Sequence, residues 1–234
     1  MGSPALRDLC IGTLGVEGVL CMFALGIACL SHRHWRDRLG LARGTLSAGR
    51  CALLVFGAVA LSFALDGAIE LAGLRSGTPL EEFALLLAGA RGVDFAFALL
   101  ALGLAPGFAE ELLCRGLVQR GLEARLGAAG AIAVAALSFG ALHVDPVHGG
   151  FAVLLGLYLG IVAARADSIR PAIVCHTSNN LLAVYFAAHG PELRPAGPFG
   201  IGLALAISIA CLWFACRPGS GRAELQVETG SDDL

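Results

Sequence analysis

Apolar stretches long enough to cross a lipid bilayer recur from the first residues of this sequence almost to its last. Leu9–Leu30 and Cys51–Leu74 are two of them, and a helix needs about 20 apolar residues to span the hydrocarbon core. Hydrophobic residues make up 57% of the chain and charged residues only 15%, with a mean hydropathy of +0.78. A soluble domain carries far more charge. The sequence therefore predicts an all-α fold, a polytopic membrane helix bundle of seven to eight transmembrane helices in the lipid bilayer.

Turn-forming residues divide the chain into eight predicted helical segments. In chain order they are Leu9–Leu30, Cys51–Leu74, Leu80–Leu104, Phe108–Leu126, Ala128–His143, Gly149–Ala164, Pro171–Ala188 and Phe199–Cys216. Arg91 and Asp94 are expected to break the third segment, and Ala105-Pro106-Gly107 to interrupt the chain before the fourth. Residues 1–217 are predicted to form a single membrane domain, followed by a polar, disordered tail over residues 218–234.

The distribution of arginines predicts how the bundle crosses the membrane. Five arginines lie between the first two segments. Short arginine-rich loops stay in the cytoplasm, so the N-terminus should lie outside. The arginines of residues 165–170 and Arg217 favour seven crossings with a cytoplasmic C-terminus, whereas counting Phe108–Leu126 as a full crossing gives eight. Under either count, full-length helices would leave one of Glu110, His143 and His176 at the wrong depth, so some helices must be short, tilted or broken.

Charge and cysteine usage narrow the class of function. The net charge of −2 indicates no nucleic-acid partner, because such proteins carry basic surfaces. The eight cysteines show no CxxC spacing and most lie in apolar runs, so we interpret them as small buried hydrophobes rather than a disulfide framework. The first apolar run is as long as a membrane span and lacks a clear cleavage site, so no cleavable signal peptide is expected.

Ionisable residues at membrane depth first gather in the fourth segment. On a helix Glu111 and Arg115 stand four residues apart on one face and can pair. Glu110 lies about 100° further round and is left without that partner. A charged side chain inside a membrane is costly, so it marks a functional site by default.

Two further polar clusters follow on later helices. His143 comes four residues after Phe139, and His176 is followed by Asn180 at a spacing that puts both side chains on one helical face. A lone histidine at a helix end is more often structural, and a Glu–Arg pair often has only a structural role. Three such clusters on three membrane helices are much harder to explain by packing, so the sequence predicts that they form one site.

The order and spacing of these residues resemble the CPBP family of intramembrane proteases, also called the Abi or type II CAAX-protease family. Its motifs are EExxxR, FxxxH and HxxxN. The chain matches them with Glu110-Glu111 and Arg115, with Phe139 and His143, and with His176 and Asn180. The resemblance covers residues 108–180, and the remainder agrees only in being apolar helix. It implies an eight-helix membrane bundle with endopeptidase activity.

The resemblance also implies a role for each residue. In related glutamic intramembrane endopeptidases the first glutamate of the pair and the FxxxH histidine activate a water, which assigns Glu110 and His143. The HxxxN pair stabilises the oxyanion, which assigns His176 and Asn180. These roles are physically sensible, because a desolvated carboxylate is a stronger base and donors on a rigid helix are preorganised. Glu111, paired with Arg115, would fix the position of the helix and the electrostatic field at the site. No cofactor and no metal is predicted.

Three other functions are weighed against this one. One glutamate and two histidines from three helices could bind zinc with an open position, but the chain has no HExxH and the arginine brings positive charge close to the site. A non-catalytic scaffold or self-immunity protein would be expected to lose a catalytic residue, and none is missing. A transporter would usually show related halves with a broken helix in each, and no such repeat is found.

The substrate expected from the resemblance is a membrane-anchored protein or peptide, cut near its C-terminus or next to a hydrophobic segment. Family relatives process prenylated CAAX tails, bacteriocin-type peptides, or the C-terminal sorting helices of surface proteins. The Gly/Ala/Arg-rich composition and the lack of a targeting segment favour the bacterial inner (cytoplasmic) membrane. There, a C-terminal sorting helix is a better expectation than a prenylated tail.

Overall fold

The structure is a computed structural model that describes residues 4–190 and 197–217, so the predicted tail at 218–234 lies outside the described residues. Every regular element in the described ranges is a helix, and η1 and η2 are π-helical. The elements are α1 (Pro4–Cys29), α2 (Trp35–Arg38), α3 (Ala48–Leu71), α4 (Pro79–Leu87), α5 (Gly92–Ala98), η1 (Leu99–Leu104), α6 (Ala105–Glu111), η2 (Leu112–Gln119), α7 (Arg120–Ala141), α8 (Pro146–Ala166), α9 (Arg170–His189) and α10 (Gly197–Cys216). The predicted all-α membrane helix bundle is confirmed.

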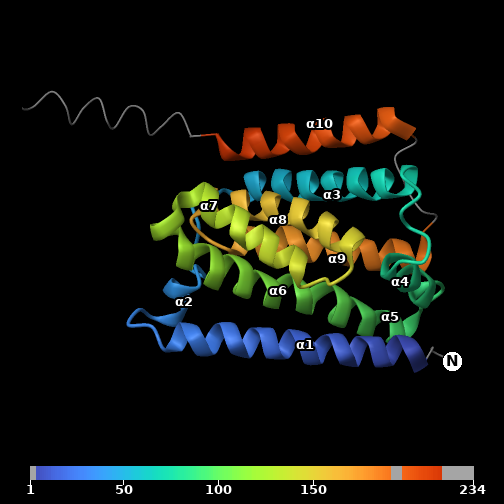
Figure 1. Cartoon of the computed structure of the whole chain (residues 1–234), viewed down its shortest axis with the longest axis horizontal. Coiled ribbons are helices and arrows are strands. Elements are labelled where there is room, and N and C mark those ends of the chain that lie inside the picture. The colour runs from blue at the N-terminus through green and yellow to red at the C-terminus, as the bar shows by residue number, and fades with distance from the viewer. Residues whose placement is uncertain (1–3, 191–196, 218–234) are drawn as a thin grey trace, which may run out of the picture.

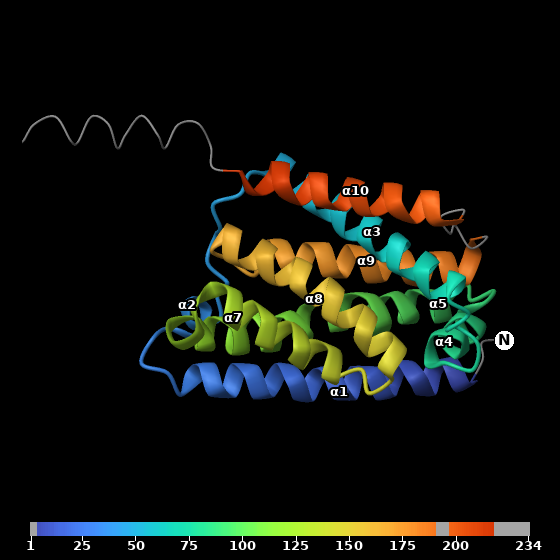
Figure 2. The same cartoon turned by 45° about the horizontal axis from the view of Figure 1, so that its top comes forward.

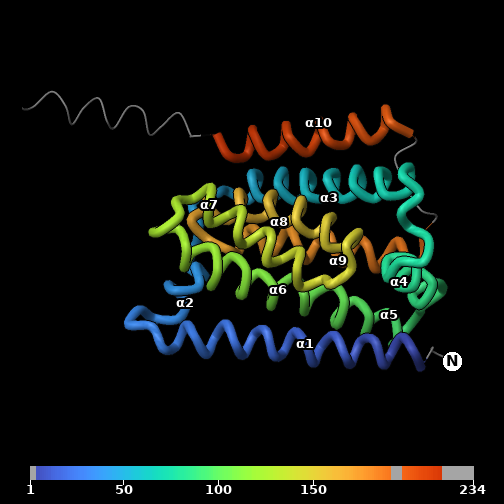
Figure 3. Tube along the Cα trace, in the orientation of Figure 1, coloured from blue at the N-terminus to red at the C-terminus, as the bar shows by residue number. Residues whose placement is uncertain are grey.

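Five helical stretches in the described part of the chain are long and apolar enough to cross a membrane, namely α1, α3, Gly92–Ala141, α8 and α10. The stretch Gly92–Ala141 contributes two rods, because Gly127 adopts φ 68° and ψ 171° and the chain reverses there (Figure 3). A side chain at this positive φ would be strained, which is why glycine suits the turn. With α9, the described residues form seven long rods, within the predicted range of seven to eight.

The rods stack in layers, with α9 near the middle of the bundle. It packs on α3, α6, η1 and α8, while α10 packs on α3 and α1 packs on α6 and η2. Figures 1 and 2 show α1 and α10 on opposite outer faces. The inner position of α9 explains why it can carry polar residues through an apolar bundle.

The rod Ala128–Ala141 is short. Some helix had to be short, tilted or broken if Glu110, His143 and His176 were to lie at the same depth. At 1.5 Å per residue it is roughly 21 Å long, less than the thickness of a bilayer core of about 30 Å. The turn from α7 to α8 therefore lies part-way along the bundle and not at its end (Figure 1). That turn carries His143, so the short rod brings this histidine to an inner depth.

The expected interruption at Ala105-Pro106-Gly107 is absent, and this prediction was wrong. The helix runs on from α5 through η1 into α6. A proline ring clashes with the carbonyl four residues before it, but the π-helical turn of η1 widens the helix just ahead of Pro106. There the Ala105 N–H bonds to the carbonyl of Leu100, five residues back. The expected break near Arg91 does occur, between α4 and α5.

Arginines gather at one end of the bundle. They flank the α1–α3 connection, the Gly127 turn, the α8–α9 turn and the end of α10: Arg33, Arg36, Arg38, Arg43, Arg50, Arg120, Arg125, Arg165, Arg170 and Arg217. At the other end Arg7 pairs with Asp94 at 2.7 Å and Arg75 pairs with Glu70 at 3.1 Å. The positive-inside rule would place the arginine-rich end in the cytoplasm. The two ends of the described chain lie at opposite ends of the bundle (Figure 1), as an odd number of crossings requires.

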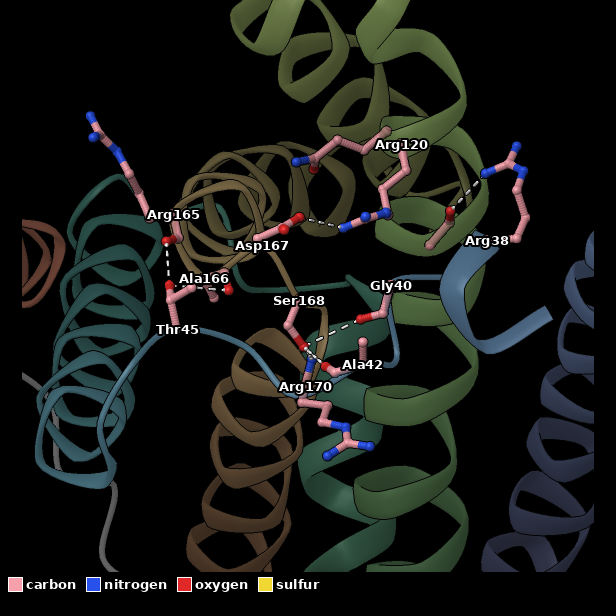
Figure 4. A network of polar contacts seen from close by, with 12 residues as sticks. Arg38, Gly40, Ala42, Thr45, Arg120, Arg165, Ala166, Asp167, Ser168 and Arg170 are labelled. Carbon is pink, nitrogen blue, oxygen red and sulfur yellow. Dashed lines mark hydrogen bonds and ion pairs between the residues drawn. The ribbon is translucent and has the colours of Figure 1, made fainter. Parts of the chain in front are cut away.

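Figure 4 shows how the arginine-rich end is tied together. The Ser168 hydroxyl donates to the carbonyls of Gly40 (3.3 Å) and Ala42 (2.8 Å), and Arg120 pairs with Asp167 at 3.2 Å. The Ser168 bonds fasten the α8–α9 turn to the segment after α2, and the Arg120–Asp167 pair fastens it to α7. They therefore fix where α9 begins and, with it, the position of the histidine two turns further on.

Candidate active site

Glu111 and Arg115 form a fully buried ion pair at the centre of the bundle. Arg115 Nη1 lies 2.6 Å from Glu111 Oε1, and neither side chain is exposed to solvent. The pairing predicted from the i,i+4 spacing is therefore confirmed. In apolar surroundings such a pair needs further hydrogen bonds to offset desolvation.

Arg115 obtains such contacts from two neighbouring helices. Its Nη2 donates to the carbonyl of Gly156 on α8 at 2.9 Å, and the guanidinium lies 4.7 Å from the ring centroid of Phe139 on α7. A cation over an aromatic face is attracted by the ring quadrupole. One buried arginine thus joins η2, α7 and α8 around the site.

His176 on α9 completes the buried cluster. Its Nδ1 lies 3.0 Å from Glu111 Oε1, and its Nε2 lies 3.7 Å from Glu110 Oε2. A carboxylate only accepts hydrogen bonds, so Nδ1 carries the proton and donates to Glu111. Glu111 therefore holds the ring in one orientation, and the second nitrogen faces Glu110.

Phe139 lies between two histidines and contacts both rings edge-on. The ring centroids are 5.1 Å apart for His143 and 5.4 Å apart for His176. His143 Nδ1 donates to the Phe139 carbonyl at 2.9 Å, since a carbonyl can only accept. The FxxxH spacing thus fixes the tautomer of His143 and leaves its Nε2 free. His143 lies in the turn beyond the helical span, and burial lowers its pKa, an effect that the Phe139 bond opposes.

Close packing of α6 on α9 brings the acids to the histidine. A Cβ on Gly107 would lie 2.3 Å from Oγ1 of Thr177 and 2.8 Å from its Cα. Only a residue without a side chain allows this approach. Gly107 is three residues before Glu110 and Thr177 directly follows His176, so the contact determines how near Glu110 and His176 can come.

A cavity of about 620 Å³ opens beside the cluster. It is lined by the site residues Glu110, Phe139, His143, His148, His176, Asn179 and Asn180, by Glu17 on α1, and by Asp66 and Arg75 further out. Its walls are otherwise mostly apolar side chains of α1, α3, α4, α8 and α9. A cavity with apolar walls and a few convergent polar groups is typical of a ligand or substrate site.

Comparison with known families places this site. Residues 92–182 match a family model described as "Type II CAAX prenyl endopeptidase Rce1-like". The match spans α5 to most of α9 and contains all three predicted motifs. This match is consistent with the CPBP family that the motifs resemble. Comparisons with curated proteins and with solved structures found no match.

The match to this family supports the interpretation of the protein as a membrane protease. The apolar helices of the fold agree with an integral membrane protein. The structure brings Glu110, His143, His176 and Asn180, all of them inside the matched residues, to one cavity. Asn179, the neighbour of Asn180, also reaches this cavity. It is 8% exposed, and it follows His176 by three residues, so the two side chains lie on the same face of α9.

Two residues at this site were not assigned a role from the sequence. His148 lies near a turn, which by itself indicates no role, but its ring centroid is 4.3 Å from that of His143 and its side chain lines the cavity. Glu17 lies outside the family match, on α1, and is buried at the cavity that Glu110 also lines. The sequence does single it out, because Glu17 is the only charged residue of the predicted span Leu9–Leu30. An ionisable residue at membrane depth is a functional hypothesis by default.

No group of three or more His, Cys, Asp or Glu side chains in the described ranges is arranged to hold a metal ion. Glu110 and His176 do approach each other, but Nδ1 of the histidine is committed to Glu111. Metal independence stays a prediction that chemical analysis can test.

Proposed function

We propose that the chain is a glutamic-type intramembrane endopeptidase in which Glu110 activates a water. The observation that carries this proposal is that the two adjacent glutamates have different contacts. Glu111 is bound to both Arg115 and His176, whereas Glu110 faces the cavity with the His176 Nε2 at 3.7 Å. Glu110 is therefore the carboxylate available to take a proton from water.

His143 assists at the same water. Its Nδ1 proton is donated to the Phe139 carbonyl. The Nε2 lone pair of the neutral ring can therefore accept a hydrogen bond from the attacking water. The water oxygen attacks the carbonyl carbon of the scissile bond, and its proton goes to Glu110. The apolar walls of the cavity strengthen these interactions by excluding bulk water.

His176 and Asn180 would then hold the oxyanion. Asn180 can donate through its neutral amide. His176 donates through Nε2 only as an imidazolium, because its other proton already points to Glu111. The Glu111 carboxylate stabilises that charge, as a buried acid does for the histidine of a hydrolytic triad. The buried acid thus has a chemical reason to contact the histidine as well as the arginine.

The substrate class proposed is a membrane-anchored protein cut near its C-terminus or next to a hydrophobic segment, with a C-terminal sorting helix favoured over a prenylated tail. The enzyme would act in the bacterial inner membrane. Mostly apolar cavity walls and an arginine-rich end suit a substrate held in lipid.

The test reconstitutes the purified chain in lipid vesicles with two synthetic substrates. One is a tagged peptide ending in a hydrophobic helix, and the other is a farnesylated peptide ending in a CAAX sequence. We expect cleavage of the first, dependent on Glu110 and insensitive to a chelator. Preference for the farnesylated peptide would overturn the substrate class, and cleavage by Glu110→Gln at the wild-type rate would overturn the mechanism.

A further inference from the structure

A third carboxyl reaches the cavity from outside the family match. Glu17 lies in the middle of α1, where Leu9, Thr13 and Glu17 line the cavity at four-residue spacing. Its side chain is 6% exposed, and its Oε2 has no hydrogen-bond partner among the described residues. A buried polar atom without a partner costs free energy, so it calls for an explanation.

The charges around Glu17 indicate what its carboxyl can do. Glu17 and Glu110 are both buried and line the same cavity. Arg115, a fully buried cation of the site, is already bound to Glu111, to a backbone carbonyl and to the Phe139 ring. Two carboxyls in one apolar cavity do not both ionise readily, so one keeps its proton while the other is a base.

The proposed reaction needs such an acid. Peptide hydrolysis leaves an amine, and the C–N bond of the tetrahedral intermediate breaks readily only when the nitrogen receives a proton. The two histidines of the site are poorly placed for this, because each uses its Nδ1 proton on a fixed partner. Neutral His143 presents a lone pair at Nε2, and the Nε2 proton of the His176 imidazolium is held by the oxyanion in the function proposed above.

We propose that Glu17 is a catalytic carboxylic acid that protonates the leaving amine. Glu110 takes a proton from water as the oxygen bonds to the carbonyl carbon. Glu17 then gives its proton to the nitrogen as the C–N bond breaks. Both products leave, and the proton on Glu110 passes to the Glu17 carboxylate, so the enzyme returns to its starting state with one water consumed. The proposal rests on the function proposed above.

The test varies the leaving group. The synthetic helix-ended substrate is made in two forms, one with the normal amide and one with a thioester at the scissile position. A thiolate leaves without protonation, whereas an amine does not. Glu17→Gln should lose about 10²–10⁴-fold in kcat on the amide and stay within severalfold of the wild type on the thioester. Glu110→Gln should lose activity on both substrates, because each needs the activated water.

Matched variants keep the result interpretable. Ser62→Ala removes another polar group of the same cavity wall and should act alike on both substrates. Glu17→Asp keeps the acid and should retain part of the amide activity if Glu17→Gln fails to fold. Equal losses of Glu17→Gln on amide and thioester, or none on the amide, would overturn the assignment of Glu17. An inactive wild type, or an active Glu110→Gln, would instead overturn the underlying proposed function.

Discussion

Nδ1 of His176 lies 3.0 Å from Oε1 of Glu111, the same oxygen that pairs with Arg115 at 2.6 Å. A single carboxylate oxygen therefore links two motifs that lie 65 residues apart in the sequence. This contact gives the two adjacent glutamates different chemistry. Glu111 is held by two partners from different elements, while Glu110 remains at the cavity.

The first prediction concerns Glu110. Glu110→Gln should remain folded, because glutamine is nearly isosteric and the side chain takes no part in the ion pair of Arg115. Cleavage of the helix-ended substrate should fall by about 10²–10⁴-fold or more, the usual cost of a positioned base. The measurement is the steady-state cleavage rate at equal protein, together with the thermal unfolding midpoint in the same detergent.

The second prediction is that Glu111 matters for stability as well as for activity. Glu111→Gln leaves the fully buried Arg115 without its counter-charge, which typically costs about 3–5 kcal/mol. The unfolding midpoint should drop well below that of Glu110→Gln. Replacing both partners, as Glu111→Gln with Arg115→Met, should recover part of that loss. An unfolding midpoint for Glu111→Gln equal to that of the wild type would contradict the buried pair.

The third prediction tests the approach of α6 to α9. Gly107→Ala should force the helices apart and cost about 1–3 kcal/mol, with a loss of cleavage, because the new Cβ meets Thr177 at 2.3–2.8 Å. Adding Thr177→Ala should not restore activity, since the backbone Cα of residue 177 remains in the way. Gly12→Ala is the matched control, because a Cβ there meets nothing within 4 Å.

The fourth prediction separates the two asparagines. Asn180→Ala should lower kcat by about 10²–10³-fold with little change in KM, as expected for the loss of an oxyanion donor. Asn179→Ala should have a much smaller effect on kcat, although its side chain also lines the cavity. The larger kcat loss in Asn179→Ala would show that the other amide holds the oxyanion. An effect of Asn180→Ala on KM alone would assign it to substrate binding.

The fifth prediction is that activity needs no metal ion. Elemental analysis of active, detergent-purified protein should find well under one metal per chain, and chelators should leave the cleavage rate unchanged. A stoichiometric zinc, with activity lost on chelation and restored by zinc, would favour a Glu/His/His metalloprotease instead.

The sequence by itself determined the features that depend on local spacing. Apolar runs of membrane length predicted the helices, because lipid leaves backbone groups no partner outside the helix. The i,i+4 spacing predicted the Glu111–Arg115 pair, since helical geometry alone brings those side chains together. The FxxxH spacing likewise placed His143 against the Phe139 carbonyl.

Only the tertiary structure decided which distant groups share the site. His176 was predicted to act with Asn180, yet its hydrogen bond is to Glu111 on another helix. The helix continues through Pro106 because a π-helical turn absorbs the missing bond, and no local rule predicts that shift. Glu17 joins the cavity because α1 packs on α6 and η2. Such contacts depend on how helices far apart in the sequence pack, and side-chain periodicity along one helix carries no information about its neighbour.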